Sequence, residues 1–318
     1  MALVDVIIPV FNTRLQFVVA ALSSLREQTF SDWKSWVIDD GSDAEYGIKL
    51  AETLRSFDDR RIEYLYSDHQ GISASRNVAI MKGRAPYIAF LDSDDCWMPD
   101  HLSNHVKILD ANDAITLTHG HFSIIDSDGQ TLKSKPAVEG LNSLNFSQCF
   151  VRMLIENFVA FSSVVVRRSA VEQIEGFDGT FPCLSDKVFL LRLLNAGAKF
   201  HHDPAAALQY RVHPQNISKK TDLLFTTRRR LIDLAEKFIQ SNPLLGDIDW
   251  PSLKKEMERH RYKEAAEAHF AQHRYTEALK YGSPLHSGLS RRSCMLFLRS
   301  LARSIASPGH RANSHTLP

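Results

Sequence analysis

The sequence predicts an α/β protein with a mostly parallel sheet flanked by helices, followed by an all-helical C-terminal extension. Over the first 220 residues, short apolar runs rich in β-branched residues alternate with segments of helical periodicity, which is the pattern of right-handed βαβ units. After about residue 220 the periodicity is helical throughout. We therefore expect two regions, residues 1–220 and 221–318.

The first predicted strand is "LVDVIIPV" (residues 3–10), a β-branched run that a proline ends, as expected for a buried strand. Apolar residues then recur at helical spacing over residues 14–27. An Asp-Gly pair stops the second strand, "SWVIDDGS" (35–42). The next expected elements are strands at 62–66 and 86–91 and helices at 44–56, 73–83 and 99–112.

The middle of the chain is less regular, and the tail is helical. Strands are expected at 114–125, 158–168 and 205–213, a turn at 126–129, and a helix at 186–197 that Gly197 closes. The helices expected in the tail are 221–240, 252–270, 274–281 and 290–306. Residues 263–281 resemble one helix–turn–helix unit of a tetratricopeptide-like repeat, although one unit is not an array.

Composition excludes several classes of protein. The net charge of +1 gives no field that favours nucleic acid, so no nucleic-acid partner is expected. The four cysteines lie far apart and match no zinc spacing, which predicts free thiols in a reducing compartment. No basic segment precedes the first apolar run, and no run reaches the ~18 apolar residues of a membrane span. We expect a cytoplasmic protein, either free or peripheral on the inner face of the membrane.

Carboxylates gather where the predicted strands end. Asp39 and Asp40 close the second strand, and Asp92, Asp94 and Asp95 follow the strand at 86–91. Ligands of such sheets bind at the carboxyl ends of the strands. If the strand end is extended, Asp92 and Asp94 face the same side, and hard oxygen ligands of this kind suit Mg²⁺ or Mn²⁺ bound to a diphosphate. The alternative is a solvated loop that caps the next helix.

Several segments in order resemble one enzyme family. They are "VIIPVFN", "QTFSDWKSWVIDDGSD", "GISASRNVAIMKGRAPYIAFLDSDDCWMPD", "GFDGTFPCLSDKVFLLRLLNAG" and "YRVHPQNIS". Together they resemble the family 2 glycosyltransferases with the glycosyltransferase-A (Rossmann-like) fold. The resemblance covers roughly residues 3–218 and leaves out the helical tail. It implies sugar transfer from a nucleotide-sugar donor with inversion, assisted by Mn²⁺ or Mg²⁺.

The resemblance also implies roles for individual residues. The nucleotide-binding residues it implies are Pro9, Phe11, Asn12, Asp40, Arg76, Asn77, Asp92 and Arg211. The metal ligands it implies are Asp94, Asp92 and His213. Asp40 matches the carboxylate that accepts a hydrogen bond from the uracil N–H, which an acceptor-only group does well. The alternatives are structural, since Asp40 also fits a turn, Arg76 a surface helix and His213 a packed side chain.

The catalytic base implied by the resemblance is Asp186. A carboxylate there takes the proton from the acceptor hydroxyl as its oxygen attacks the anomeric carbon, and the metal neutralises the departing diphosphate. The family usually has Glu-Asp before an aromatic residue, whereas this chain has Ser185-Asp186-Lys187. The alternative is that Ser185 caps the helix and Asp186 only favours its N-terminus electrostatically.

The tail contains a basic amphipathic segment, residues 290–306, which fits either an anionic membrane surface or packing within its own domain. We predict an inverting, metal-dependent glycosyltransferase that moves a sugar from a UDP-sugar to a glycan or lipid-linked glycan during surface polysaccharide synthesis. One alternative is a non-catalytic nucleotide-sugar-binding or scaffolding protein that uses its helical tail. A sugar nucleotidyltransferase is disfavoured because "PVFNTRL" lacks the glycines of its phosphate loop.

Overall fold

The computed structural model describes residues 2–134, 140–156, 158–213, 221–282 and 299. The chain forms two compact units, residues 1–216 and 217–318. All but one residue of the helix predicted at 290–306 lies outside the described residues.

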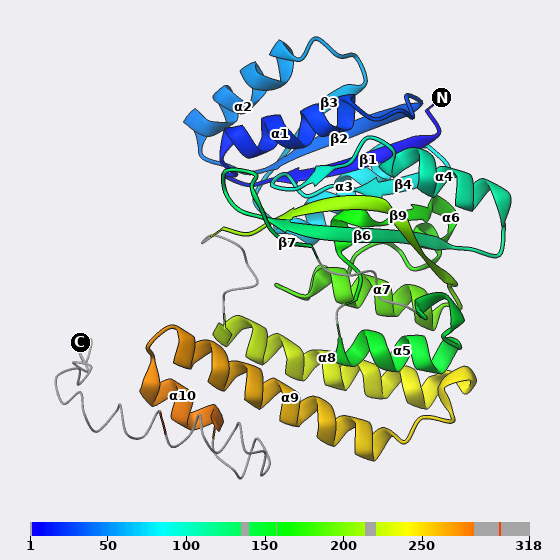
Figure 1. Cartoon of the computed structure of the whole chain (residues 1–318), viewed down its shortest axis with the longest axis vertical. Helices are drawn as coiled ribbons and strands as arrows, with labels where there is room; N and C mark the ends of the chain where they lie inside the picture. Colours follow the sequence, from blue (N-terminus) through cyan, green and yellow to red (C-terminus); the bar gives the residue numbers. More distant parts are fainter. Residues whose placement is uncertain (1, 135–139, 157, 214–220, 283–298, 300–318) are drawn as a thin grey trace. The chain divides into compact units, whose positions relative to one another are not determined.

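The first unit contains one mixed sheet with helices on both faces (Figure 1). Its strands are β1 (Val4–Val10), β2 (Trp33–Asp40), β3 (Ile62–Ser67), β4 (Tyr87–Phe90), β5 (Cys96–Trp97), β6 (Leu117–Ile125), β7 (Thr131–Ser134), β8 (Val165–Arg167) and β9 (Phe200–Arg211). Its α-helices are α1 (Leu15–Arg26), α2 (Ala44–Ser56), α3 (Ile72–Lys82), α4 (His101–Ala111), α5 (Phe146–Ile155), α6 (Arg168–Gln173) and α7 (Ser185–Asn195), with 3₁₀ turns η1 (Leu141–Ser143) and η2 (Phe161–Ser163).

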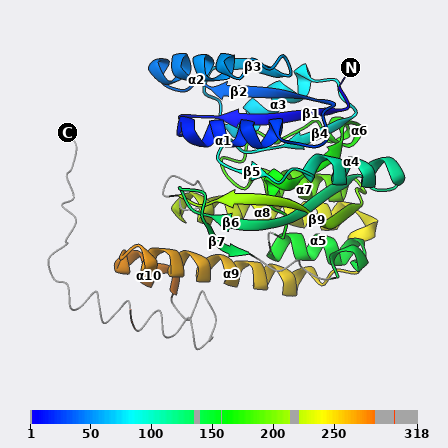
Figure 2. The same cartoon turned by 45° about the horizontal axis from the view of Figure 1, so that its top comes forward.

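The strand order is β3-β2-β1-β4-β8-β6-β9-β5, with β7 paired to β6. Strands β1 to β4 pair in parallel, and β6 pairs in parallel with β9. Strand β8 is antiparallel to both β4 and β6, which joins the two parallel parts. The carboxyl ends of β1, β2 and β4 therefore lie at one edge of the sheet, which Figure 2 shows from a second direction.

Both faces of the sheet are buried, as expected for strands covered by helices on each side. Val4, Val6 and Ile8 of β1 pack into one core together with α1 and α4. On the opposite face, Phe90 contacts Phe161, Phe177 and Phe189, with ring centroids 4.8–5.6 Å apart. Phe189 belongs to α7, and the cluster contacts two of the predicted site residues described below.

A buried ion pair fixes the opposite, amino-terminal edge of the sheet. Arg168 donates to Asp5 Oδ2 at 2.6 Å and to the carbonyl oxygens of Ala85 and Ile80. Asp5 also accepts from Trp36 Nε1 at 2.8 Å and from the Ala85 N–H at 2.7 Å. The Asp5 carboxylate thus joins β1 to β2, to the start of β4 and to α6.

The structure corrects the prediction of a strand over residues 158–168. Only Val165–Arg167 are extended, because η2 bends the chain before them and α6 begins at Arg168. Both serines of η2 are buried with polar partners, since Ser162 accepts from the Asp92 N–H and Ser163 accepts from the Gly120 N–H. An apolar run rich in valine therefore gave a misleadingly long strand.

Other boundaries also differ from those predicted. Strand β9 begins at Phe200, five residues before the predicted start, since its first part pairs with β6. Helix α5 was not predicted, although Asn145 and Gln148 form a capping box at its start. Ser185 does not cap α7; Leu184 is the N-cap, with φ 58°, and makes no side-chain cap bond.

The second unit is helical over its described residues, in α8 (Thr221–Ser241), α9 (Trp250–Ala271), α10 (Tyr275–Gly282) and the 3₁₀ turn η4 (Pro243–Leu245). Arg228 and Arg229 of α8 pair with Glu264 and Glu258 of α9. Helices α9 and α10 form a hairpin, but the tetratricopeptide-like assignment stays a prediction. In the described part of the chain, no helix combines the length and apolarity needed to span a bilayer.

We expect Arg168→Ala to lower the free energy of unfolding by about 3–5 kcal/mol, because it leaves the buried Asp5 carboxylate without its charged partner. Arg60→Ala is the matched control, since Arg60 is exposed. Urea denaturation followed by circular dichroism measures both. Equal stability of the two variants would show that the Asp5–Arg168 pair does not hold the sheet.

Buried histidines lie between α4 and the strands β6 and β9. His101 stacks on Trp97 with centroids 4.5 Å apart and contacts His105. His119 contacts His202 at 4.9 Å between centroids. Burial lowers the pKa of His101 to about 3 and lowers the pKa values of His105 and His119 well below the usual value. These side chains are therefore neutral in the folded protein near pH 7.

The lowered pKa values predict acid sensitivity. An unfolded histidine takes up a proton near pH 6.5, whereas folded His101 does so only near pH 3. Between these pH values unfolding takes up a proton. The free energy of unfolding therefore decreases as the pH is lowered, by up to about 1.4 kcal/mol per pH unit for each such histidine. We expect the melting temperature of His101→Phe to fall less than that of the wild type between pH 7 and 5.5. Parallel pH profiles would contradict this expectation.

Candidate active site

The loops that follow β1, β2 and β4 meet at the carboxyl edge of the parallel strands, where hydrogen bonds join them to one another. Asn12, with φ 48°, donates its N–H to Ser42 Oγ at 2.9 Å and accepts from the Asp43 N–H at 3.1 Å. The hydroxyls of Thr13 and Ser93 lie 2.9 Å apart. The loops after β1, β2 and β4 therefore form one connected surface, and the predicted residues Asn12, Asp40 and Asp92–Asp95 lie on it.

Asp40 is held at the end of β2 by the loop that leads into α3. Its carboxylate accepts from the N–H groups of Gln70 and Gly71, both at 3.1 Å. Its neighbour Asp39 points to the other face of the strand and accepts from the Ser42 N–H and the Tyr64 hydroxyl. Asp39 thus stabilises the turn, and Asp40 faces the α3 side.

The acidic segment after β4 is a turn and not the extended strand end that was predicted. The Asp95 N–H donates to the Asp92 carbonyl at 3.1 Å, which closes the turn over Ser93 and Asp94. Asp92 and Asp94 were expected to face the same side because they alternate along a strand. They lie near each other because of this bend instead. Ser162 supports the turn, because its hydroxyl accepts from the Asp92 N–H at 3.2 Å.

Arg76 neutralises Asp92 from beneath. Its guanidinium donates to Asp92 Oδ1 at 2.5 Å and lies over the rings of Phe161 and Phe177, 4.7 and 5.2 Å from their centroids. Arg76 is only 2% exposed, so it is a buried residue of the site and not a surface helix residue. The aromatic cluster thereby orients the arginine, and the arginine orients Asp92.

Asp94 contacts His213, with Oδ2 and Nε2 2.8 Å apart. Burial raises the pKa of Asp94, the Asp92 charge raises it further, and the contact with His213 opposes the rise. Burial and the charges of Asp94 and Asp92 raise the pKa of Asp95 well above its usual value. These directions show that the turn concentrates negative charge at an energetic cost, which a bound cation would relieve.

Arg211 secures the acidic turn from the end of β9. Its backbone N–H donates to Asp95 Oδ1 at 2.8 Å, and its guanidinium donates to the carbonyls of Asp94, at 2.8 Å, and Asp126, at 2.9 Å. The guanidinium also lies over Phe17. This buried arginine therefore binds protein carbonyl groups here, and its contact with a diphosphate stays a prediction.

Asp186 lies in the first turn of α7, and Tyr210 lies near the end of β9. Burial raises the pKa of the Tyr210 phenol, and the carboxylates of Asp95, Asp92, Asp94 and Asp186 raise it further. Because such electrostatic effects weaken with distance, all four carboxylates are near enough to Tyr210 to act on its pKa. The structure therefore brings the predicted base and the predicted metal ligands to one region.

Two predicted nucleotide ligands have structural contacts instead. Pro9 lies inside β1, buried and paired with Ile38, and not in the loop that follows the strand. Asn77 exchanges two hydrogen bonds with the backbone of Phe177, at 2.8 and 2.9 Å. The nucleotide-binding roles of both residues stay predictions, and the observed contacts explain their positions in the fold.

The structure also adds residues that sequence reasoning missed. His69 stacks on Phe11 and contacts Asp40, and Ser162 supports Asp92. The sequence gave no signal for either residue. His69 lies three residues before a helix and Ser162 lies within an apolar run, and the partners of both are distant along the chain.

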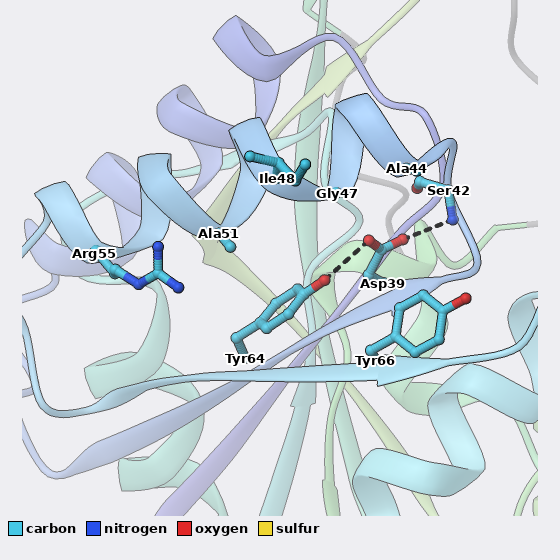
Figure 3. A pocket seen from close by; sticks show the side chains of 9 residues that line it. All are labelled: Asp39, Ser42, Ala44, Gly47, Ile48, Ala51, Arg55, Tyr64 and Tyr66. Atoms are coloured by element: carbon cyan, nitrogen blue, oxygen red, sulfur yellow. Dashed lines mark hydrogen bonds between the residues drawn. The ribbon is translucent and has the colours of Figure 1, made fainter.

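A pocket of about 460 Å³ lies between α2 and the edge strand β3 (Figure 3). Asp39 and Tyr64 lie at its floor, and Ile48, Arg55 and Tyr66 lie around it. The pocket is on the Asp39 side of β2, opposite the side on which Asp40 faces α3. It is therefore separate from the acidic turn.

The residues fit a divalent metal by donor chemistry, although they are not arranged as a complete metal site. Within the described residues, no group of three His, Cys, Asp or Glu side chains lies close enough together to hold a metal ion. Asp94 and His213 are in contact, but Asp92 is turned toward Arg76. Carboxylate oxygen and imidazole nitrogen are ligands that Mn²⁺ accepts.

The sequence matches one family of known proteins. The family model described as Glycosyl transferase family 2 matches residues 5–175, more than half of the chain. An uncharacterised glycosyltransferase of Rickettsia bellii is 34% identical over 148 residues, which cover 46% of this chain and 20% of that protein. The UDP-Glc:alpha-D-GlcNAc-diphosphoundecaprenol beta-1,3-glucosyltransferase WfgD of Escherichia coli is 32% identical over 127 residues, 40% of this chain and 48% of that protein. The chain thus spans between about a fifth and a half of these relatives.

Solved structures show the same fold at low sequence identity. S. aureus TarS 1-349 in complex with UDP-GlcNAc has a TM-score of 0.60 at 14% identity and covers 96% of this chain and 81% of that chain. The mannosyltransferase PcManGT from Pyrobaculum calidifontis, in complex with GDP-Man and Mn²⁺, has a TM-score of 0.60 at 15% identity, over 95% and 80% of the two chains. The predicted fold class is confirmed.

Proposed function

Because the chain belongs to glycosyl transferase family 2, we propose that it is an inverting glycosyltransferase that transfers a sugar from a UDP-sugar to a hydroxyl group. The observation that carries the proposal is the acidic turn, in which Arg76, His213 and Arg211 hold Asp92, Asp94 and Asp95, together with Asp186 in the first turn of α7. Two chemically different tasks need carboxylates there, neutralising a diphosphate through a cation and taking up a proton. A purely structural turn needs neither.

We propose that the donor lies along the edge formed by the loops after β1, β2 and β4. Asp40 accepts a hydrogen bond from the base, Phe11 offers an exposed aromatic face, and Asn12 shapes the loop between them. The uridine assignment is supported by an acceptor-only carboxylate at Asp40 and by the UDP-sugars in the names of WfgD and the TarS complex. Arg76 and Asp92 come next toward the diphosphate.

The metal in this proposal is Mn²⁺ or Mg²⁺, held by Asp94 with His213 and Asp92. When bound, such an ion neutralises the charge of the departing diphosphate. The burial of the Asp94 carboxylate and its repulsion by Asp92 support this assignment, as does the Mn²⁺ in the PcManGT complex. Arg211 keeps Asp94 in place through its backbone carbonyl.

Asp186 is the proposed general base. It removes the proton from the acceptor hydroxyl while the acceptor oxygen forms a bond to the anomeric carbon. The bond from that carbon to the diphosphate oxygen breaks on the opposite face, so the configuration inverts. The proton ends on Asp186, and the electron pair leaves with the nucleoside diphosphate. The raised pKa of Tyr210 keeps its phenol neutral and able to donate a hydrogen bond.

The proposed acceptor is a glycan or a lipid-linked glycan of a surface polysaccharide. The diphosphoundecaprenol acceptor in the name of WfgD supports this class. A lipid-linked acceptor lies at a membrane, which fits the peripheral attachment through residues 290–306 expected from the sequence.

We expect Asp186→Asn to reduce transfer by about 10²–10⁴-fold, because the neutral amide takes no proton, while UDP affinity stays unchanged. Release of UDP from UDP-glucose, with a diphosphoundecaprenol-linked GlcNAc acceptor, measures transfer. Asp113→Asn, which changes an exposed side chain, is the control. Turnover near the wild-type rate would remove Asp186 as the base. Wild-type protein that binds UDP yet transfers no sugar would favour the scaffolding alternative.

We expect Asp94→Ala to abolish the part of UDP binding that needs Mn²⁺, since the variant loses the main metal ligand. Chelation of the metal with EDTA should weaken UDP binding to the wild type and leave the variant unaffected. Calorimetric titration of UDP with and without Mn²⁺ measures both effects. An unchanged Mn²⁺ dependence in the variant would exclude Asp94 as a ligand.

A further inference from the structure

The loop between β3 and α3 places a histidine next to the carboxylate proposed to contact the base. The rings of Phe11 and His69 are stacked, with centroids 4.2 Å apart and planes 19° apart. Phe11 is 48% exposed, and the His69 side chain is 55% exposed. The loop packs directly on the end of β2. A Cβ atom added to Gly41 would lie only 2.5 Å from the backbone nitrogen of His69.

The contacts of His69 determine which ring nitrogen carries a hydrogen. Nδ1 lies 2.9 Å from the backbone oxygen of Asp40 and 3.0 Å from Asp40 Oδ2. Both oxygens are acceptors, so Nδ1 must be the donor whether the ring is neutral or charged. His69 therefore donates its hydrogen bond to the Asp40 backbone oxygen in either protonation state, and Nδ1 also lies close to the carboxylate oxygen Oδ2.

The two oxygens of Asp40 consequently differ. Oδ2 faces His69 Nδ1 and the Gly71 N–H, whereas Oδ1 accepts from the Gln70 N–H. A carboxylate offers about four lone-pair positions in all. In the described part of the chain each oxygen accepts one backbone hydrogen bond, and the His69 ring also lies against Oδ2, so Oδ1 is the less crowded acceptor.

We propose that His69 is a positioning residue that sets the base selectivity of the donor site. It holds the backbone of Asp40 and lies against Oδ2, which favours the Asp40 rotamer that presents Oδ1 to an N–H at the edge of the base while the base stacks beside Phe11. Uracil offers such an N–H. Cytosine offers a bare ring nitrogen at the same position, so two acceptors face each other and binding is weakened. This inference rests on the proposed nucleotide-sugar function.

The test is calorimetric titration of UDP and CDP, each with Mn²⁺, into the full chain and three variants. His69→Ala should lower UDP affinity by about tenfold, or ~1.4 kcal/mol, because the Asp40 carboxylate is then less firmly oriented, and it should reduce the preference for UDP over CDP. His69→Asn keeps an amide N–H near the position of Nδ1 and should recover much of that preference. Gln70→Ala is the control, since only its backbone N–H contacts Asp40.

The outcomes separate this inference from the function on which it rests. Suppose that His69→Ala is folded by circular dichroism and binds UDP and CDP with the affinities of the wild type. That result would overturn the role of His69 and leave the enzyme assignment intact. Loss of affinity for UDP and CDP by the same factor would reduce His69 to a general support of the loop. A wild-type chain that binds no nucleotide overturns the proposed function and this inference together.

Discussion

The buried carboxylate of Asp5 is the constraint on which the rest of the first unit depends. It accepts hydrogen bonds from β2, from the start of β4 and from Arg168 of α6. A charge in that position is stable only while every partner is in place. The register of three parallel strands is thereby fixed at their amino ends, and their carboxyl ends then emerge at a common edge.

At that common edge the fold gathers charge that would repel itself without partners. Arg76 balances Asp92, His213 contacts Asp94, and Arg211 holds the backbone of the turn. The balance is incomplete, since the pKa values of Asp94 and Asp95 are still raised. A site that disfavours its own charges is predisposed to bind a cation, and this residual repulsion is the physical link between the fold and the proposed chemistry.

The two faces of the sheet contribute differently to this site. The face toward α1 and α4 is a core of aliphatic side chains that sets the strand positions. The other face holds the phenylalanine cluster, which contacts Arg76 and includes Phe189 of α7, three residues after Asp186. Asp92 and Asp186, 94 positions apart in the sequence, are therefore linked through one aromatic layer.

The sequence by itself determined the βαβ alternation, the helical tail and the positions of Asp40, Asp92, Asp94 and Asp186, because periodicity and motif spacing are local properties of the chain. The tertiary structure decided how those residues are used. It made the acidic segment a turn and turned 158–163 into the support of that turn. It buried Arg76 and Arg211 and placed His69 against Asp40. Each of these depends on hydrogen bonds or ring contacts between residues far apart in the chain, which local sequence patterns do not encode.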